Sequence, residues 1–337
     1  MAIFFTSPIG LGHATRDVAI AEELNAHVLF VSGEGAAQLL TRRGYNALDV
    51  YRPEKFVVES GQLRHPFKWL MGYYSYYKKC KAIARKVLDQ HNGLIVSDED
   101  FASIAIGEEM RRKRVIITDV TETHFTAGAA SIIEKRMNRT MQKMMRQCDC
   151  VIIPYRGKDE DNVVHVGPIV RKISASRESL RERFGLTRKT IVLSVGGTEA
   201  GRFLVEKTLA AYRNSQSCLD AELVIVSGPS LSVPETPDCR NLGFIDNLHE
   251  LIFAADLVIS LAGRSSIDES IAYGTPGIFI PIRGHFEQEQ GAARLGFGHE
   301  DITRLESLIE EKLGKRNEAK AAEGAERAAK IIADLSN

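Results

Sequence analysis

A carboxylate placed one turn inside a helix, just after a buried strand, is the feature of this sequence best suited to chemistry. Residues 256–261 have the apolar pattern of a buried parallel strand, and Gly263 follows, where backbone can approach a ligand closely. Ser265 and Asp268 have the spacing of a capping box, which predicts that a helix begins there. Helix N-termini bind anions, and Glu269 shares a helix face with Ser265. The segment predicts either a site for a phosphate and its neighbouring ribose, held by Glu269, or simply a capped helix.

A second candidate site follows the first expected strand, residues 2–6. The glycine-rich turn Gly10-Leu-Gly12 leads into a helix and is followed at once by His13. We predict His13 to be a general base, with helix capping or phosphate binding as the alternative. Asp98 follows another expected strand, residues 94–97, and parallel strands end at one edge of a sheet. Asp98 could therefore orient His13 and stabilise its imidazolium.

Two other interpretations of these loops have less support. The Gly10 to Gly12 turn lacks the third glycine of a dinucleotide fingerprint, and no acidic residue ends the second strand. Asp98 and Asp100 also form an Asp-x-Asp pair, the usual chelator of a nucleotide-sugar metal. The phosphate-binding loops elsewhere favour a metal-free site, so we expect no metal and no cofactor.

The second half of the chain repeats the pattern of strand, turn and helix. Gly196, Gly197 and Thr198 follow an apolar strand, and their amides could cradle a diphosphate, with a tight strand-to-helix turn as the alternative. After another strand, Glu287 and Gln288 could each bind sugar hydroxyls. These positions extend the predicted phosphate and sugar site beyond Glu269.

Short Val- and Ile-rich runs alternate with helical patterns along most of the chain, which predicts parallel sheets covered on both faces. Two series of runs predict two doubly wound domains, residues 1–167 and 168–337, because Gly167-Pro168 interrupts the pattern. The expected strands are residues 2–6, 27–31, 47–50, 94–97, 115–118 and 150–154, then 190–195, 222–227, 241–244, 257–261 and 277–281. Residues 300–337 are expected to be helical.

Composition excludes several classes of protein. Lys plus Arg and Asp plus Glu both number 44, so bulk charge gives no reason to expect a nucleic-acid partner. The 5 cysteines include no Cys-x-x-Cys pair, which favours a reducing compartment. There is no cleavable apolar leader and no apolar stretch of about 18 residues, the length that spans a bilayer. We therefore expect a cytoplasmic protein.

Residues 51–92 interrupt the alternation with a cluster of aromatic side chains that runs into a basic helix. Such a segment could contact the inner face of a membrane or a lipid-linked molecule. The alternative, which we favour, is a long helix whose aromatic side chains pack on the first domain while its lysines are solvated.

Taken in order, these motifs resemble the GT-B superfamily of glycosyltransferases, and most closely its MurG-like branch, which uses UDP-N-acetylglucosamine. The resemblance is strongest over residues 243–295. It implies two Rossmann-like domains that face each other across a cleft, with acceptor binding in the first and nucleotide-sugar binding in the second. Its implied donor-binding positions are Arg171, the two glycines and threonine at 196–198, Ile245, Gly263, Arg264, Ser265, Ser266, Glu269, Glu287 and Gln288; Gly10, Gly12 and His13 form the implied acceptor loop.

The resemblance implies an inverting, metal-independent transferase that moves N-acetylglucosamine or a hexose from a UDP-sugar to a hydroxyl acceptor, with a lipid-linked acceptor as one alternative. The Glu287-Gln288 pair is also similar to that of natural-product and lipid glucosyltransferases, and His13 with Asp98 is similar to their catalytic dyad. Ala14-Thr15-Arg16 departs from the MurG-like loop, which leaves the acceptor open. The rival functions are a UDP-sugar 2-epimerase of the same fold and a non-catalytic nucleotide-sugar-binding subunit.

Overall fold

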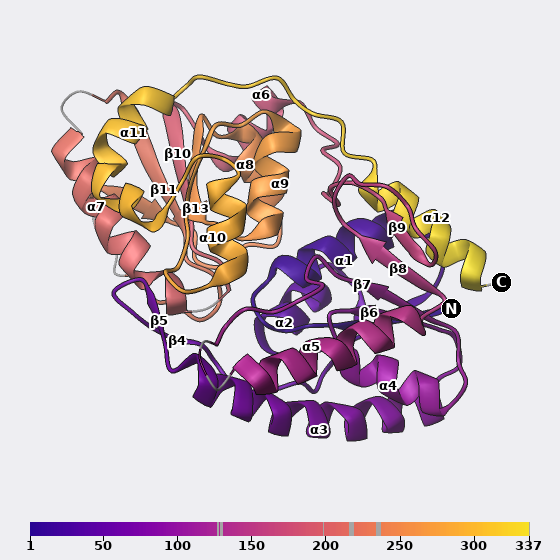
Figure 1. Ribbon diagram of the computed structural model, residues 1–337. Helices are drawn as coiled ribbons and strands as arrows, with labels where there is room; N and C mark the ends of the chain where they lie inside the picture. The colour runs from indigo at the N-terminus through magenta and orange to yellow at the C-terminus, as the bar shows by residue number, and fades with distance from the viewer. Residues whose placement is uncertain (127, 129–130, 198, 216–218, 234–236, 337) are drawn as a thin grey trace. The chain divides into compact units, whose positions relative to one another are not determined.

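The computed structural model describes residues 1–126, 128, 131–197, 199–215, 219–233 and 237–336 (Figure 1). The chain forms two compact units. Unit 1 comprises Met1–Phe56, His65–Val170 and Ala322–Asn337, and unit 2 comprises Val57–Arg64 and Arg171–Ala321. The chain passes from unit 1 to unit 2 between Val170 and Arg171, within several residues of the division expected at 167/168. Two segments differ from the prediction: the C-terminal helix packs in unit 1, and a short hairpin from the first half packs in unit 2.

The described part of unit 1 contains a seven-stranded parallel sheet in the order β3-β2-β1-β6-β7-β8-β9. Its strands are β1 (Ala2–Thr6), β2 (Val28–Ser32), β3 (Asn46–Asp49), β6 (Leu94–Asp98), β7 (Arg114–Ile117), β8 (Cys150–Ile153) and β9 (Val163–His165). Its helices are α1 (Gly12–Glu23), α2 (Glu34–Arg42), α3 (Pro66–Gln90), α4 (Phe101–Glu109), α5 (Ser131–Arg146) and α12 (Gly324–Ser336). The central strands are almost wholly apolar because helices cover both faces of the sheet.

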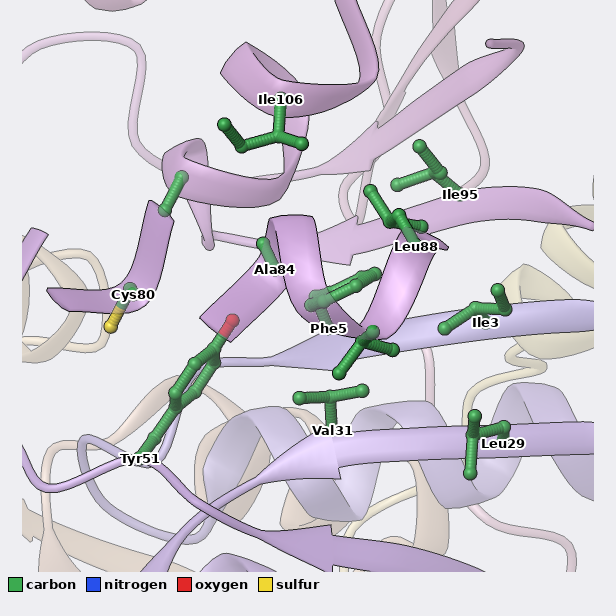
Figure 2. Close-up of a cluster of buried hydrophobic side chains, with 12 residues drawn as sticks. Ile3, Phe5, Leu29, Val31, Tyr51, Cys80, Ala84, Leu88, Ile95 and Ile106 are labelled. Atoms are coloured by element: carbon green, nitrogen blue, oxygen red, sulfur yellow. The ribbon is translucent and has the colours of Figure 1, made fainter. Parts of the chain in front are cut away.

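A cluster of buried side chains fixes α3 to this sheet (Figure 2). Cys80, Ala84 and Leu88 lie four residues apart, which places them on one face of α3. They pack with Phe5 of β1 and Ile95 of β6. The first half of α3 is different, because it exposes Phe67, Met71 and Tyr74 on one face. The aromatic segment thus forms the long helix that we expected, with part of its apolar surface packed and part left in contact with solvent.

The described part of unit 2 contains a five-stranded parallel sheet in the order β12-β11-β10-β13-β14. Its strands are β10 (Lys189–Ser194), β11 (Ala221–Val226), β12 (Cys239–Asn241), β13 (Leu257–Leu261) and β14 (Gly277–Ile280). Its helical segments are α6 (Arg177–Phe184), η2 (Glu199–Gly201), α7 (Arg202–Ser215), α8 (Leu248–Ala254), α9 (Arg264–Tyr273), α10 (Phe286–Ala293), η3 (His299–Arg304) and α11 (Leu305–Lys312). The antiparallel hairpin β4 (Val57–Glu59) and β5 (Gln62–Arg64) also belongs to this unit.

The strand order of each sheet determines which loops meet. In unit 1 the order reverses between β1 and β6, where Thr6 is paired with Asp98. In unit 2 it reverses between β10 and β13, where Ser194 is paired with Ser260. Ligands of open α/β sheets bind outside the carboxyl ends of the strands at such reversals. The loops predicted to carry the chemistry follow these strand ends.

Candidate catalytic and nucleotide-binding sites

His13 and Asp98 lie together at the strand reversal of unit 1. His13 is in the first turn of α1, and its Nδ1 lies 2.9 Å from Oδ1 of Asp98, the last residue of β6. The Asp98 side chain is fully buried, whereas that of His13 is 18% exposed. Gly10 of the preceding turn has φ of 82°, a left-handed conformation that favours glycine, and Gly12 begins the helix. The structure therefore brings the two predicted dyad residues into hydrogen-bonding contact.

Arg16, which sequence reasoning did not select, completes this cluster. Its Nε donates to Oδ2 of Asp98 at 2.8 Å, and its Nη2 donates to Oδ1. Nη1 also reaches Asp119 at 3.4 Å. Arg16 lies one turn after His13 on α1, and only 5% of the residue is exposed. A bidentate guanidinium fixes the position of a carboxylate, so Arg16 holds Asp98 in place beneath the imidazole.

Glu99 occupies the other side of the His13 ring. Its Oε2 lies 3.7 Å from Nε2 of His13, and its Oε1 accepts a hydrogen bond of 3.1 Å from Oγ1 of Thr118. The backbone of Glu99 has φ of 56°, which is uncommon for a residue other than glycine. Strained backbone of this kind occurs often at functional sites. The conformation directs a second carboxylate toward the ring nitrogen that Asp98 does not contact.

The charges of this cluster set the protonation state of His13. Burial alone would lower the pKa of His13, but Asp98 and Glu99 outweigh burial and raise that pKa to about 9. Burial would raise the pKa of Asp98, but Arg16 and His13 hold it well below its usual range. Burial, with Asp98 nearby, raises the pKa of Asp17 well above its usual range. At neutral pH the ligand-free site therefore contains the His13 imidazolium and the Arg16 guanidinium beside the ionised carboxylate of Asp98.

Asp100 has a separate structural role. It is the N-cap of α4, where its carboxylate accepts from the backbone N–H groups of Ala102 and Ser103, both at 3.2 Å. The hydroxyl of Tyr51 donates to the same carboxylate at 2.9 Å. Asp98 and Asp100 therefore serve different partners. A helix cap and a histidine partner account for the Asp-x-Asp spacing, which removes the main argument for a metal at this motif.

In unit 2, α9 begins directly after β13, as the sequence predicts, but its cap differs. Gly263 is the N-cap, and no side chain caps the helix. The N-cap thus lies two residues before Ser265, so the predicted capping box of Ser265 and Asp268 is not what starts the helix, and Asp268 accepts from Nε of Arg264 at 2.7 Å. Among the described residues, no atom lies within 4 Å of where a Cβ on Gly263 would be. Open space at the N-terminus of a helix suits an anionic ligand, and Ser265 and Ser266 lie in its first turn.

Glu269 is buried on α9, with 3% of the residue exposed. Its Oε1 has no hydrogen-bond partner among the described residues. Burial raises the pKa of Glu269 to about 8, although the nearby positive charge of Arg171 opposes the shift. Arg171 is also buried and donates to the backbone oxygen of Asp246 at 2.8 Å. A buried carboxylate with an unsatisfied oxygen is costly unless a ligand supplies donors, which is the environment that a ribose-binding glutamate requires.

The remaining predicted donor-binding residues lie in loops at this edge of the sheet. Gly196 and Gly197 follow β10, and Gly196 has φ of 78° with open space where a side chain would project. Thr198 lies outside the described residues. Ile245 is half-buried in the loop before α8, next to the Asp246 carbonyl that Arg171 contacts. The N-cap residue of α8 is Asn247.

Glu287 and Gln288 occupy the first turn of α10 and are both half-buried. Oε1 of Gln288 accepts from the backbone N–H of Ile282 at 3.0 Å, which leaves its amide nitrogen as the group that it can offer to a sugar. His285 is the N-cap residue, and burial lowers its pKa to about 4, so its imidazole is neutral. Packing of Ala292 with Ile267 places α10 beside α9. The predicted sugar-binding and ribose-binding helices are therefore neighbours.

Comparison with known proteins agrees with this arrangement. The glycosyltransferase family 28 C-terminal domain matches residues 191–334. The uncharacterized glycosyltransferase MK0977 of Methanopyrus kandleri is 25% identical over 74% of this chain and 78% of its own length. A UDP-N-acetylglucosamine–N-acetylmuramyl-(pentapeptide) pyrophosphoryl-undecaprenol N-acetylglucosamine transferase of Caldicellulosiruptor saccharolyticus is 25% identical over 80% of this chain and 75% of its own. The crystal structure of MurG from Acinetobacter baumannii covers 99% of both chains with a TM-score of 0.56 and 13% identity.

The chain has two doubly wound parallel-sheet units, and the loops at their strand reversals are where ligands bind in such folds. Together with the similarities above, these features identify a glycosyltransferase of the GT-B fold. Within that class the chain is MurG-like. The fold and the resemblance expected from the sequence are confirmed. The roles of the individual residues stay predictions.

Proposed function

We propose that this protein is an inverting, metal-independent glycosyltransferase that moves a sugar from a UDP-sugar to the hydroxyl of an acceptor. The observation that carries the proposal is the pairing of His13 with Asp98, because it orients an imidazole at the strand reversal of unit 1. A positioned base is what direct displacement at a sugar carbon requires. The MurG-like similarity and the loops of unit 2 support a nucleotide-sugar donor.

In the proposed reaction, unit 2 holds the donor. The N-terminus of α9 and the glycines after β10 bind the diphosphate, Glu269 accepts from the ribose hydroxyls, and Arg171 adds positive charge nearby. Glu287 and the amide nitrogen of Gln288 bind the sugar hydroxyls. Backbone amides and the helix dipole are the groups that stabilise negative charge on UDP as it leaves.

Unit 1 activates the acceptor. Neutral His13 takes the hydroxyl proton at Nε2, while Asp98 accepts from Nδ1–H and stabilises the resulting imidazolium. The acceptor oxygen forms a bond to the anomeric carbon, and the bond from that carbon to the UDP oxygen breaks with its electron pair. The attack comes from the side opposite UDP, so the anomeric configuration inverts. UDP and the glycosylated acceptor are the products.

N-acetylglucosamine and a hexose are both compatible with this donor site, and we propose the former first because of the MurG-like similarity. For the acceptor we propose a lipid-linked molecule at the inner surface of the cytoplasmic membrane. Exposed Phe67, Met71 and Tyr74 on α3, with exposed Ile132 and Ile133 on α5, form apolar surface in unit 1 that suits such a molecule. No helix in the described parts of the chain is both long and apolar enough to cross a bilayer.

Incubation with UDP-sugars distinguishes the proposed function from its rivals. UDP release that depends on an added hydroxyl acceptor, with one anomeric configuration inverted in the product, is the expected result. Deuterium exchange at C2 of the sugar without an acceptor would identify a 2-epimerase. Binding of UDP-sugars without turnover in the presence of a lipid-linked acceptor panel would identify a non-catalytic subunit.

A further inference from the structure

The hairpin Val57–Arg64 is the part of the structure that the proposed function does not use. The chain on both sides of it belongs to unit 1, yet the hairpin itself belongs to unit 2. β4 and β5 are three-residue antiparallel strands joined at Ser60 and Gly61. Such a short hairpin is not stable by itself in water, so its conformation depends on what it packs against.

The hairpin pairs with the loop between β14 and α10. The backbone N–H of Arg283 donates to the carbonyl of Gly61 at 2.8 Å, and the N–H of Leu63 donates to the carbonyl of Arg283 at 2.9 Å. Gln62 and Arg283 thus form a parallel bridge. Both backbone polar groups of Arg283 are satisfied by the hairpin, which fixes the middle of this loop.

The fit at Gly61 is close. Its φ is 77°, and a Cβ added there would lie 2.6 Å from a ring carbon of His299 and 2.8 Å from the ring of Phe203. Nδ1 of His299 lies 2.9 Å from the carbonyl oxygen of Pro281, at the start of the same loop. Leu63 is buried, with 7% of the residue exposed. The hairpin is therefore closely packed against η3, α7 and the loop after β14.

The same loop sets the position of the predicted sugar-binding residues. Ile282 donates to the side chain of Gln288, and Gly284 donates to the side chain of Glu289 at 2.9 Å. Arg283 lies between these two donors. The hairpin therefore fixes the backbone segment that is hydrogen-bonded to the first turn of α10. Displacement of Arg283 would move both anchoring amides and, with them, Gln288.

We propose that the β4–β5 hairpin is a positioning element for the sugar of the donor, acting through the backbone of Arg283 on Gln288. The proposal rests on the proposed function. The hydrogen bonds of the hairpin go to Arg283, and Gly61 lies against His299 and Phe203, whereas Glu269, Arg171 and the α9 N-terminus lie on other elements. β4 also packs against η2, which follows the glycine loop after β10. Its loss should therefore weaken recognition of the sugar while leaving recognition of UDP in place.

The test compares Gly61→Ala with Gly314→Ala. Gly314 has φ of 78°, nearly that of Gly61, but a Cβ there meets only the end of Lys189 at 3.7 Å. Both variants place a side chain at nearly the same positive φ, and only the Cβ of Gly61→Ala meets the rings of His299 and Phe203. Leu63→Ser serves as a second disruption of the docking if Gly61→Ala does not fold.

Two measurements are made on each protein. Hydrogen exchange of residues 281–286 reports docking, and calorimetry with UDP, UDP-N-acetylglucosamine and UDP-glucose reports binding. In Gly61→Ala we expect faster exchange and a ratio of UDP-sugar to UDP dissociation constants about tenfold higher than in the wild type, the effect of about one hydrogen bond. Gly314→Ala should match the wild type in both measurements.

Faster exchange with an unchanged ratio would overturn the proposal, because the loop would then move without consequence for the sugar. Unchanged exchange in both hairpin variants would also overturn it, because the docking on which it stands would be absent. A wild-type protein that binds neither UDP nor either UDP-sugar would instead contradict the proposed function, and the exchange data would still report whether the hairpin is docked.

Discussion

Oδ1 of Asp98 lies 2.9 Å from Nδ1 of His13, although 85 positions separate the two residues in the chain. They meet because β1 and β6 are adjacent in the sheet and end at the same edge. Arg16 binds both oxygens of Asp98, so the carboxylate is fixed before any ligand arrives. A hydrogen bond from Nδ1–H to Asp98 leaves Nε2 as the ring atom that can take a proton from an acceptor.

Asp98→Asn should reduce turnover by about 10² or more, because an amide can present its N–H to Nδ1 and favour the wrong tautomer. It should also destabilise the protein by about 3 kcal/mol, since Arg16 would lose the charge that balances it in a buried site. Steady-state kinetics and denaturant unfolding measure the two effects. Asp49→Asn removes an exposed partner of Arg52 and should cost less than about 1 kcal/mol. Equal stability of the two variants would contradict the role of Arg16.

Glu99→Gln should shift the pH dependence of kcat/KM to lower pH. The base must be neutral, and the free-enzyme pKa of His13 is about 9, so the rate should rise with pH through about 9 in the wild type. Glu99 is one of the two carboxylates that raise this pKa, and its removal should move the rise toward the ordinary histidine value of about 6.5. A profile that does not move would show that Glu99 does not act on the base. A wild-type rise near 6.5 would show that Asp98 and Glu99 do not set the pKa.

Sequence patterns predict the parts of the structure that are determined by neighbouring residues in the chain. β1, β6 and β13, which precede or end at the loops of His13, Asp98 and Gly263, stop where the apolar runs stop. This follows because a buried parallel strand must be apolar throughout. The contact between His13 and Asp98 followed from the rule that such strand ends share one edge. α9 begins close to the expected position, and the long helix α3 lies within the expected segment 51–92.

Features that depend on distant partners were missed. Arg16 is not predicted because its charge partners, Asp98 and Asp119, are far away in sequence. Its position one turn after His13 on the same helix is the sequence feature that indicates a role in the site. The capping box does not start α9, because the backbone after β13 turns into the helix at Gly263, two residues before Ser265. β4, β5 and β9 are three residues long, too short to show the alternation of apolar and polar residues that indicates a strand. α12 follows the second domain in sequence, yet its buried Ala and Ile face packs in unit 1.

Glu269→Gln should lower UDP affinity and yet stabilise the ligand-free protein. At pH 9, where the Glu269 carboxylate is ionised, we expect a loss of about 1.5 to 3 kcal/mol in UDP binding, the range for hydrogen bonds to a charged group. The folded-state pKa of Glu269 is raised to about 8, so its contribution to stability is present below the unfolded value and is lost as pH rises through about 8. The variant should therefore exceed the wild type in stability most clearly above pH 8. Calorimetry with UDP, and thermal unfolding from pH 5 to 9 without ligand, measure these effects; unchanged UDP affinity in a folded variant would refute the ribose assignment.

Removal of divalent metals should leave sugar transfer intact. The carboxylates of Asp98 and Asp100 are engaged by Arg16 and by the N-terminus of α4, and the proposed diphosphate site uses backbone amides. Transfer should proceed at an unchanged rate in EDTA. Loss of activity that magnesium or manganese restores would assign the Asp-x-Asp motif to a metal and move the catalytic role away from His13.

His13 is the proposed base, so its replacement separates catalysis from nucleotide binding. His13→Ala should leave the dissociation constant of UDP unchanged, because the proposed nucleotide site is built from unit 2, while turnover should fall by about 10² to 10⁴, the contribution of a positioned general base. His27→Ala, at an exposed histidine of the same unit, should retain full activity. The rise of kcat/KM with pH through about 9 should disappear in His13→Ala. Near-normal turnover of His13→Ala with the wild-type pH profile would contradict the assignment of His13 as the base.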